Sequence, residues 1–391
     1  MGVIIEVRDP QEDLEEKIKT YKKQTRRKKV LAVLTLLAAV VSTYLLVALQ
    51  TYDKVRVVRS YGEEAVDNSS FVQYSDGALK YSRDGIAFLD TKGQEKWNQP
   101  YQIKNPIINI SGDAVAVGDQ GGNDILVFDK KGLKGEIHTN FPIEKIVVAE
   151  NGIVCALLRN ESTPQIVCYD AMGSVLVEHK ASISTTGYPV GMAISPDGTK
   201  LQISYLCVAD GVQASRVVYF NFEEAGADKD QYQVTEDIYK NTVIPETFFL
   251  NSRKSVLVGD TSFMIYSGED KPKLTKTVEL GKEIRSVFHD ERYLGFVLHG
   301  EGEEGYELRL YSMSGEQKLS KNFTGDYNHI KISRENVIMF DGKQCLVFSS
   351  WGVRKFEGEL ETDILEMIPL SGINKYLVMS ASGMDEIRFV K

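Results

Sequence analysis

The stretch VFDKKG at residues 127–132 decides the fold, because the same pattern recurs along the chain. An aromatic or aliphatic residue, then Asp or Ser, two variable positions and Gly return as FLDTKG at 88–93, CYDAMG at 168–173 and LYSMSG at 310–315. The Asp or Ser caps a tight turn by accepting backbone N–H bonds, and the Gly adopts the positive φ that returns the chain antiparallel. Each copy therefore predicts the turn of a β-hairpin.

The residues around these turns form a repeated unit of four short strands, A to D. One copy reads PIINIS, AVAVGD, DILVFDKKG and LKGEIHTN, and the next reads EKIVVAENG, IVCALLRN, PQIVCYDAMG and VLVEHKAS. The turn between C and D carries a glycine, and successive turn glycines are 37 (315 to 352) to 53 (173 to 226) residues apart. A four-stranded propeller blade occupies about 40–50 residues. Seven blades are predicted from the glycines at positions 93, 132, 173, 226, 268, 315 and 352.

An eighth blade is predicted from the two ends of the chain. The segments DILEMIPL, KYLVMSA and EIRFVK supply its A, B and C strands, after which the sequence stops. The segment DKVRVVRSY at 53–61 alternates apolar and polar residues and supplies the missing D strand, which removes an open sheet edge. We therefore expect an all-β, eight-bladed β-propeller whose ring is closed by an N-terminal strand in the last blade. A seven-bladed ring is the alternative.

A single membrane-spanning helix is predicted before the propeller. Residues 30–49 form a run of twenty without a charge, Pro or Gly, which as a helix spans about 30 Å, the thickness of a bilayer core. Four basic residues at 26–29 precede it and predict an N-terminus in the cytoplasm. The expected organisation is a cytoplasmic leader at 1–29, a signal anchor at 30–50 and an extracytoplasmic propeller at 51–391 in the plasma membrane.

Two alternatives concern this N-terminal part. A cleaved signal peptide would have a shorter apolar stretch and a small-x-small cleavage motif, whereas Tyr44, Leu45 and Leu46 occupy the place of such a motif. The leader begins a helix at Asp9-Pro10, with acids in its first turn. Its three apolar residues at helical spacing read as a solvated helix rather than as a dimerisation stripe.

The charge of the chain argues against a nucleic-acid partner. The net charge is −9; residues 1–29 contribute +3, from nine basic and six acidic residues, so the remainder carries −12, from 37 and 49. Binding of phosphates requires clustered Lys and Arg. We therefore expect no nucleic acid among the partners.

Two longer stretches resemble known propeller families. FLDTKGQEKWNQ at 88–99 resembles the repeat of PQQ-like, quinoprotein-type propellers, and AISPDGTKLQISY at 193–205 resembles the turn of TolB-like and WD-repeat-like blades. The whole layout is similar to an uncharacterised bacterial family of membrane-anchored propellers. Quinone-dependent members of this fold carry a Trp in most blades and adjacent cysteines, whereas this chain has only Trp97 and Trp351 and no adjacent cysteines. The resemblance implies the fold and argues against quinone chemistry.

No motif for catalysis, a cofactor or a metal is found in the sequence. The five histidines are scattered over several blades without metal-ligand spacing, and there is no G-x-S-x-G elbow, P-loop or dinucleotide fingerprint. We therefore expect no cofactor, no metal and no enzymatic activity. Cys155 and Cys168 are predicted to lie nearly opposite each other in one hairpin, either as a cross-strand disulfide or as two small buried residues.

One speculative binding site is a basic ring in the central channel. Lys145, Arg285 and Lys331 occupy roughly matching places in three A strands, which line the channel of a propeller. Facing inward, they would hold a carboxylate or phosphate. Alternatively, they point to solvent near the strand ends.

Two classes of function remain open. The first is a non-enzymatic platform that binds an envelope protein or a cell-wall component through its loops. The second is an envelope enzyme of lyase or hydrolase type, or a sensor of small anions, that uses the channel. The lack of a convergent catalytic motif favours the first.

Overall fold

The computed structural model describes residues 10–61, 69–161, 163–227, 229–300 and 305–391. The chain divides into two compact units, Met1–Thr51 and Tyr52–Lys391. The first unit contains one long helix. The second contains all the strands, so each unit is described by itself.

The helix α1 (Pro10–Ala48) runs through both the predicted leader and the predicted span. It begins at the proline of the expected helix start, while Asp9 lies outside the described residues. Within it, Lys17–Leu46 is long and apolar enough to cross a membrane, a property that a signal sequence shares. No structural break separates the leader from the span.

The second unit is an eight-bladed β-propeller, and the seven-bladed alternative is wrong. Eight four-stranded antiparallel sheets each run in order from strand A to strand D. Blade 1 consists of β2 (Ser70–Tyr74), β3 (Gly77–Tyr81), β4 (Gly85–Leu89) and β5 (Glu95–Pro100), and blade 2 of β6 (Pro106–Ser111), β7 (Ala114–Asp119), β8 (Asp124–Asp129) and β9 (Gly132–His138). Blade 3 consists of β10 (Ile143–Val148), β11 (Val154–Leu158), β12 (Gln165–Tyr169) and β13 (Val175–Lys180). Blade 4 consists of β14 (Tyr188–Ile194), β15 (Lys200–Ala209), β16 (Val212–Asn221) and β17 (Gln233–Lys240).

Blades 5 to 8 continue the ring with the same topology. Blade 5 consists of β18 (Glu246–Asn251), β19 (Lys254–Val258), β20 (Ser262–Ser267) and β21 (Lys273–Glu279), and blade 6 of β22 (Ile284–His289), β23 (Tyr293–His299), β24 (Gly305–Ser312) and β25 (Gln317–Thr324). Blade 7 consists of β26 (His329–Ser333), β27 (Asn336–Asp341), β28 (Gln344–Ser349) and β29 (Arg354–Glu359). Blade 8 consists of β30 (Glu366–Pro369), β31 (Lys375–Ser380), β32 (Gly383–Val390) and, as its D strand, β1 (Lys54–Tyr61).

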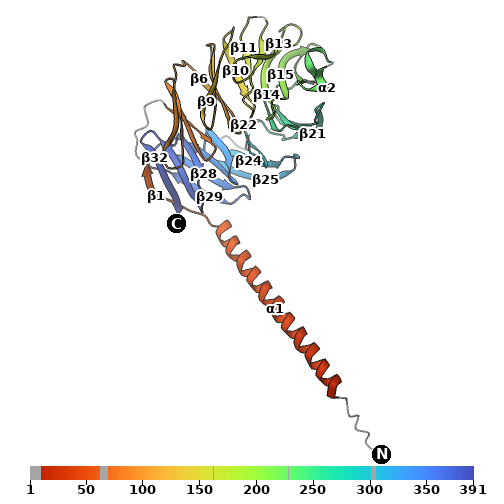
Figure 1. Cartoon of the computed structure of the whole chain (residues 1–391), viewed down its shortest axis with the longest axis vertical. Helices are drawn as coiled ribbons and strands as arrows, with labels where there is room; N and C mark the ends of the chain where they lie inside the picture. Colours follow the sequence, from red (N-terminus) through yellow and green to blue (C-terminus); the bar gives the residue numbers. More distant parts are fainter. Residues whose placement is uncertain (1–9, 62–68, 162, 228, 301–304) are drawn as a thin grey trace, which may run out of the picture. The chain divides into compact units, whose positions relative to one another are not determined.

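The ring is closed by the two ends of the propeller, as predicted. Strand β1 pairs antiparallel with β32, beside the C-terminus (Figure 1). Tyr52, just before β1, donates its N–H to the carbonyl of Lys355 in blade 7 at 2.9 Å. The first strand is therefore fixed to the last two blades, and no blade is left with a missing strand.

The hydrophobic core is divided among the eight interfaces between neighbouring blades. Eight clusters of buried apolar side chains each take members from two adjacent sheets, including one that joins blade 8 to blade 1. Strand side chains alternate between the two faces of a sheet, so each blade contributes to the clusters on both of its sides. Burial of these side chains at every interface, including that between blades 8 and 1, stabilises the closed ring.

The turn between strands C and D has the predicted chemistry. In blade 3 the carboxylate of Asp170 accepts the N–H groups of Met172 at 2.9 Å and Ser174 at 2.8 Å, and Gly173 has a φ of 89°. A β-bulge lies near the C–D connection in each of blades 1 to 7, including blade 4, where the connection is longer. The repeated signature therefore encodes one turn together with one bulge.

One of the seven turn glycines was interpreted wrongly. Gly226 lies inside the short helix α2 (Glu224–Ala227) instead of in a tight turn, and it is absent from the residues with positive φ. The helix and the following η1 (Asp230–Tyr232) occupy the longer C–D connection of blade 4. The long spacing at this repeat reflects that insertion.

Candidate functional site

A buried ion pair joins the innermost strands of blades 7 and 8. The ammonium of Lys331 in β26 lies 2.5 Å from a carboxylate oxygen of Glu366 in β30. It also donates to the amide oxygen of Gln73 in β2 at 3.2 Å, and the backbone N–H of Gln73 donates to the other Glu366 oxygen at 3.1 Å. These three residues therefore connect the A strands of blades 7, 8 and 1 across the point of ring closure.

The burial of this pair shapes its electrostatics. Burial lowers the pKa of the Lys331 ammonium, and the nearby Glu366 carboxylate opposes that shift. The Glu366 side chain is 9% exposed, and its oxygens are bonded by Lys331 and by the backbone N–H groups of Gln73 and Met367. The ion pair therefore joins blades 7 and 8, and its cation already has a carboxylate partner. We call the Lys331–Glu366 pair the inner lock.

Lys145 lies on a different part of the inner ring, near Glu246. Lys145 belongs to β10 of blade 3, and Glu246 to β18 of blade 5. The surrounding protein raises the pKa of the Glu246 carboxyl even though solvent reaches its side chain, and the charge of Lys145 opposes that shift. This behaviour is typical of a carboxylate in a wet but confined channel.

Arg285 does not join the predicted basic ring. Its guanidinium donates to the hydroxyl of Tyr306 in β24 and to Asp326, and lies 4.7 Å from the centroid of the Tyr306 ring. Tyr306 is in strand C of the same blade, so Arg285 points away from the channel. The structure therefore gives each of the three predicted cations a different partner and does not gather them around one ligand position.

A cavity of about 490 Å³ lies beside the Lys331–Glu366 pair. It is formed where blades 7, 8 and 1 meet, and its walls combine aromatic and polar side chains. Members from these blades include Tyr81, Phe340, Asn328, His329, Ser69 and Ser70. The cavity is large enough for a small solute.

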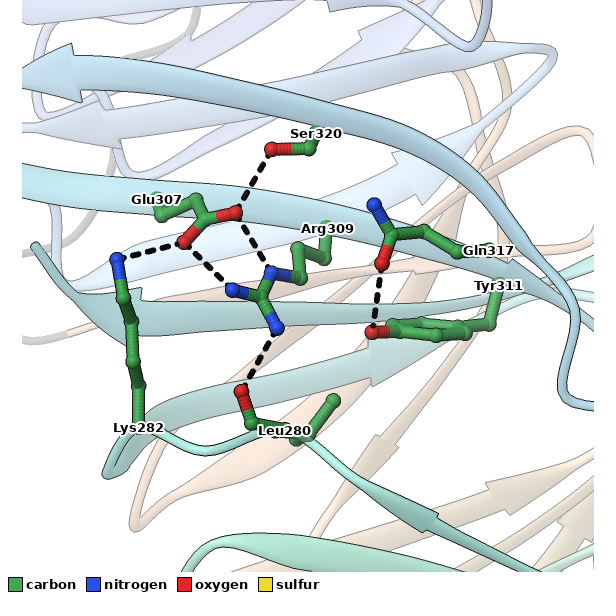
Figure 2. Close-up of polar contacts among 7 residues, drawn as sticks. All are labelled: Leu280, Lys282, Glu307, Arg309, Tyr311, Gln317 and Ser320. Atoms are coloured by element: carbon green, nitrogen blue, oxygen red, sulfur yellow. Dashed lines mark hydrogen bonds and ion pairs between the residues drawn. The ribbon is translucent and has the colours of Figure 1, made fainter.

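A second buried carboxylate, which sequence reasoning missed, lies at the interface of blades 5 and 6 (Figure 2). Glu307 is 6% exposed. Its carboxylate accepts two hydrogen bonds from the guanidinium of Arg309, at 2.6 and 2.9 Å, and one from the ammonium of Lys282, at 2.9 Å. The hydroxyl of Ser320 adds a bond of 2.7 Å. These donors, Arg309 first, lower the pKa of Glu307 to about 2. Both oxygens of Glu307 are bonded, so we interpret the cluster as structural; its two cations and one carboxylate leave a net charge of +1.

The outer rim of blades 2 and 3 carries exposed apolar side chains. Met172, in the C–D turn of blade 3, is 71% exposed, and Val175 and Leu176 in β13 are 57% and 49% exposed. The bulge in β13 falls at Leu176, which interrupts the alternation of side chains, so the consecutive residues Val175 and Leu176 are both exposed. A Cβ added at Gly135 of β9 would lie 3.3 Å from the sulfur of Met172, so this turn covers the D strand of blade 2. We call Met172, Val175 and Leu176 the apolar rim. Leu133 of β9 is also exposed, but it is opposite Phe128 and therefore lies on the face of blade 2 that is turned toward blade 1.

Other exposed apolar residues are more dispersed. Val208 and Val212, at the tip of the long β15–β16 hairpin of blade 4, are 77% and 36% exposed. They come from opposite faces of the hairpin, because Val208 is opposite Gln213 and Val212 is opposite Ala209. They therefore form no single apolar face.

Cys155 in β11 and Cys168 in β12 are directly opposite each other and joined by a disulfide. Both are buried in the cluster between blades 3 and 4. Of the two alternatives left open by the sequence, the structure contains the cross-strand disulfide, while Cys207 and Cys345 are free thiols.

Comparison with known proteins gives a family and a fold. The model of a family described as "Family of unknown function (DUF5711)" matches residues 48–389. No curated protein matches the chain.

Solved structures share the propeller fold at low sequence identity. BamB from Moraxella catarrhalis is 11% identical, with a TM-score of 0.54, covering 86% of this chain and 100% of its own. Sqt1 from Saccharomyces cerevisiae is 11% identical, with a TM-score of 0.53, covering 87% and 98%. AztD from Citrobacter koseri is 10% identical, with a TM-score of 0.51, covering 75% and 87%.

Proposed function

The chain belongs to the DUF5711 family of unknown function, and we propose that it is a membrane-tethered β-propeller that binds a partner protein of the cell envelope. The observation that carries this proposal is the apolar rim of blades 2 and 3. Its three side chains are exposed and lie on the outer strand β13 or on the turn before it, which covers β9 of blade 2. Clustered apolar residues on a surface mark sites of protein contact.

The chemistry of the rim favours a protein over a cell-wall glycan. Glycans present hydroxyl groups and are held by polar and aromatic side chains, whereas Met172, Val175 and Leu176 offer no hydrogen bonds. Methionine adapts its shape to an apolar partner surface. The outer strand β13 also has an edge that is not paired within its blade, which suits addition of a strand from the partner.

The tether and its orientation are part of the proposal. The apolar helix α1 acts as an uncleaved anchor, and the basic residues at 26–29 hold the N-terminus in the cytoplasm. The propeller then lies outside the plasma membrane. The Cys155–Cys168 disulfide supports this orientation, since structural disulfides persist in oxidising compartments.

Co-purification from solubilised membranes tests the proposed binding. The full chain should retain an envelope protein that a Val175→Glu/Leu176→Glu variant loses, because a charge on each residue disrupts an apolar contact. A Val208→Glu/Val212→Glu variant on blade 4 is the matched control and should retain the same protein. Loss of that protein in both variants, or in neither, contradicts binding at the rim.

A second candidate function uses the inner cavity. Its walls place aromatic, amide and hydroxyl groups beside the Lys331–Glu366 pair, which suits a small polar solute. Calorimetric titration with free amino acids and short peptides tests this role. Heat that disappears in Asn328→Ala, a cavity-wall variant that leaves the Lys331–Glu366 pair intact, supports it, whereas equal heats in both proteins contradict it.

A further inference from the structure

Three basic residues form a row across the outer strands of blade 8. Arg56 in β1 is directly opposite Arg388 in β32, and Arg388 is directly opposite Lys375 in β31. Directly opposed residues share one face of a sheet, and Lys54, two positions before Arg56, lies on that same face. We call Lys54, Arg56, Lys375 and Arg388 the basic strip.

This strip is unusual because like charges directly opposite each other destabilise a sheet. Lys375 has a partner, as its ammonium lies 2.8 Å from Glu386. In the part of the chain that the structure describes, neither Arg56 nor Arg388 makes an ion pair. The strip also stands out against the net charge of −12 over residues 30–391. An external anion would relieve the repulsion.

The strip lies close along the chain to the segment that enters the propeller. Helix α1 ends at Ala48, and Tyr52 is held to blade 7 by its bond to Lys355. Four residues of extended chain reach about 14 Å at most. Because Lys54 follows Tyr52 by two positions, this part of blade 8 is within reach of the bilayer surface if α1 is the proposed anchor.

Exposed apolar residues occur in blades 7 and 8 at positions close along the chain to residues of the strip or to Lys355, which bonds Tyr52. Trp351, in the turn before β29, is 64% exposed and stands four positions before Lys355. Ile373, in the turn before β31, is 49% exposed, and Val58 in β1 is 48% exposed. Trp beside Lys and Arg is typical of surfaces that lie at the level of lipid headgroups.

We propose that the basic strip and Trp351 dock the propeller against anionic phospholipid headgroups of the membrane that holds α1. The strip supplies positive charge for headgroup phosphates, and Trp351 enters the interfacial layer. This inference rests on the proposed anchoring by α1 and is independent of partner binding at the apolar rim. Docking would fix the orientation of the propeller relative to the bilayer, whereas the anchor alone would not.

Fluorescence of Trp351 in lipid nanodiscs tests this docking. A Trp97→Phe background leaves Trp351 as the sole tryptophan of the full chain. Discs contain phosphatidylcholine with a headgroup nitroxide as quencher, either alone or with about 30% phosphatidylglycerol. We expect quenching to be about twofold greater in the anionic discs at low salt and to fall to the neutral level in high salt.

Charge variants distinguish docking from tethering. Arg56→Gln/Arg388→Gln should reduce quenching in anionic discs to the neutral level. Lys130→Gln/Lys131→Gln, which removes the same charge from the C–D turn of blade 2, should leave it unchanged. Equal quenching in both kinds of disc, or no effect of the strip variant, overturns the docking surface. Recovery of the chain free of discs overturns the proposed anchor itself, and with it this inference.

Discussion

Val57 in β1 lies directly opposite Ile387 in β32, so residues 330 positions apart (387 − 57) are neighbours in one sheet. Ile387 is 2% exposed, whereas Val57 is 44% exposed. The last blade therefore draws its outer strand from the start of the propeller, and the ring cannot close before both ends are present. Closure of this kind protects the edge that a three-stranded final blade would leave open.

The first prediction concerns the closing strand. We expect the amides of Lys54–Tyr61 that pair with β32 to exchange with solvent as slowly as those of β32, because the two strands open together. Hydrogen exchange followed by mass spectrometry measures both peptides in one experiment. Exchange of the β1 peptide within seconds, beside a protected β32 peptide, would show that the first strand does not close the ring.

The second prediction concerns the inner lock. Lys331→Met leaves the buried carboxylate of Glu366 without its cation, and we expect a loss of about 3 kcal/mol in the free energy of unfolding. Adding Glu366→Gln removes the stranded charge and keeps an acceptor for the Gln73 N–H, so the double variant should regain stability. Denaturant unfolding measures all three proteins.

An exposed ion pair supplies the control for the inner lock. Lys318 lies 2.6 Å from Glu316, but the two side chains are 42% and 68% exposed. Lys318→Met should change stability by less than about 0.5 kcal/mol, because solvent screens such pairs. An inner-lock variant as mild as this control would mean that the Lys331–Glu366 pair does not hold the blades together.

The third prediction concerns acid stability. Glu307 has an ordinary pKa of 4.5, which Arg309 and its other donors lower to about 2 in the folded protein. The unfolded chain therefore takes up this proton first as the pH falls. The stabilisation is complete above about pH 5 and is lost as the pH falls from 4.5 towards 2. This lowering of the Glu307 pKa corresponds to about 3 kcal/mol of stability at neutral pH.

Two variants isolate this contribution. Glu307→Gln should be less stable than the parent at pH 7, and the gap should narrow as the pH falls from 5 to 2. Glu361→Gln, at an exposed acidic residue, should track the parent at every pH. Thermal unfolding across this pH range gives the comparison. A gap that stays constant with pH would exclude Glu307 as the titrating group.

The fourth prediction concerns the disulfide and the side of the membrane on which the propeller lies. In cells quenched with acid and then denatured, a polyethylene glycol maleimide should modify two of the four cysteines, Cys207 and Cys345. All four should react after reduction. Modification of all four without reductant would place the propeller in a reducing compartment and contradict the proposed orientation.

Local chemistry explains what the sequence could predict. The turn at Asp170 and Gly173 is made within one short segment, so its signature counts blades without knowledge of the tertiary structure. The closing strand was predictable because 53–61 alternates like a strand and had no partner within a repeat. Gly226 was misread because an insertion replaced the tight turn, and composition alone does not distinguish the two.

Side-chain direction explains what the sequence could not predict. In β22 a register shift makes Arg285 the extra residue of a bulge, and in β10 the corresponding extra residue is Glu144, one position before Lys145. Lys145 and Arg285 therefore do not occupy equivalent places, although strict alternation suggested that they do. The apolar rim depends on a further bulge, at Leu176, and on which strand is outermost.

Site-specific photocrosslinking in cells is the most direct test of partner binding at the apolar rim. A benzophenone amino acid replaces Met172 in the turn of blade 3, and in a control it replaces Lys92, which has the same place in the turn of blade 1. The account predicts one discrete crosslinked protein from position 172 that is lost in Val175→Glu/Leu176→Glu and is absent from position 92. The same adduct from both positions, or none from position 172, would contradict it.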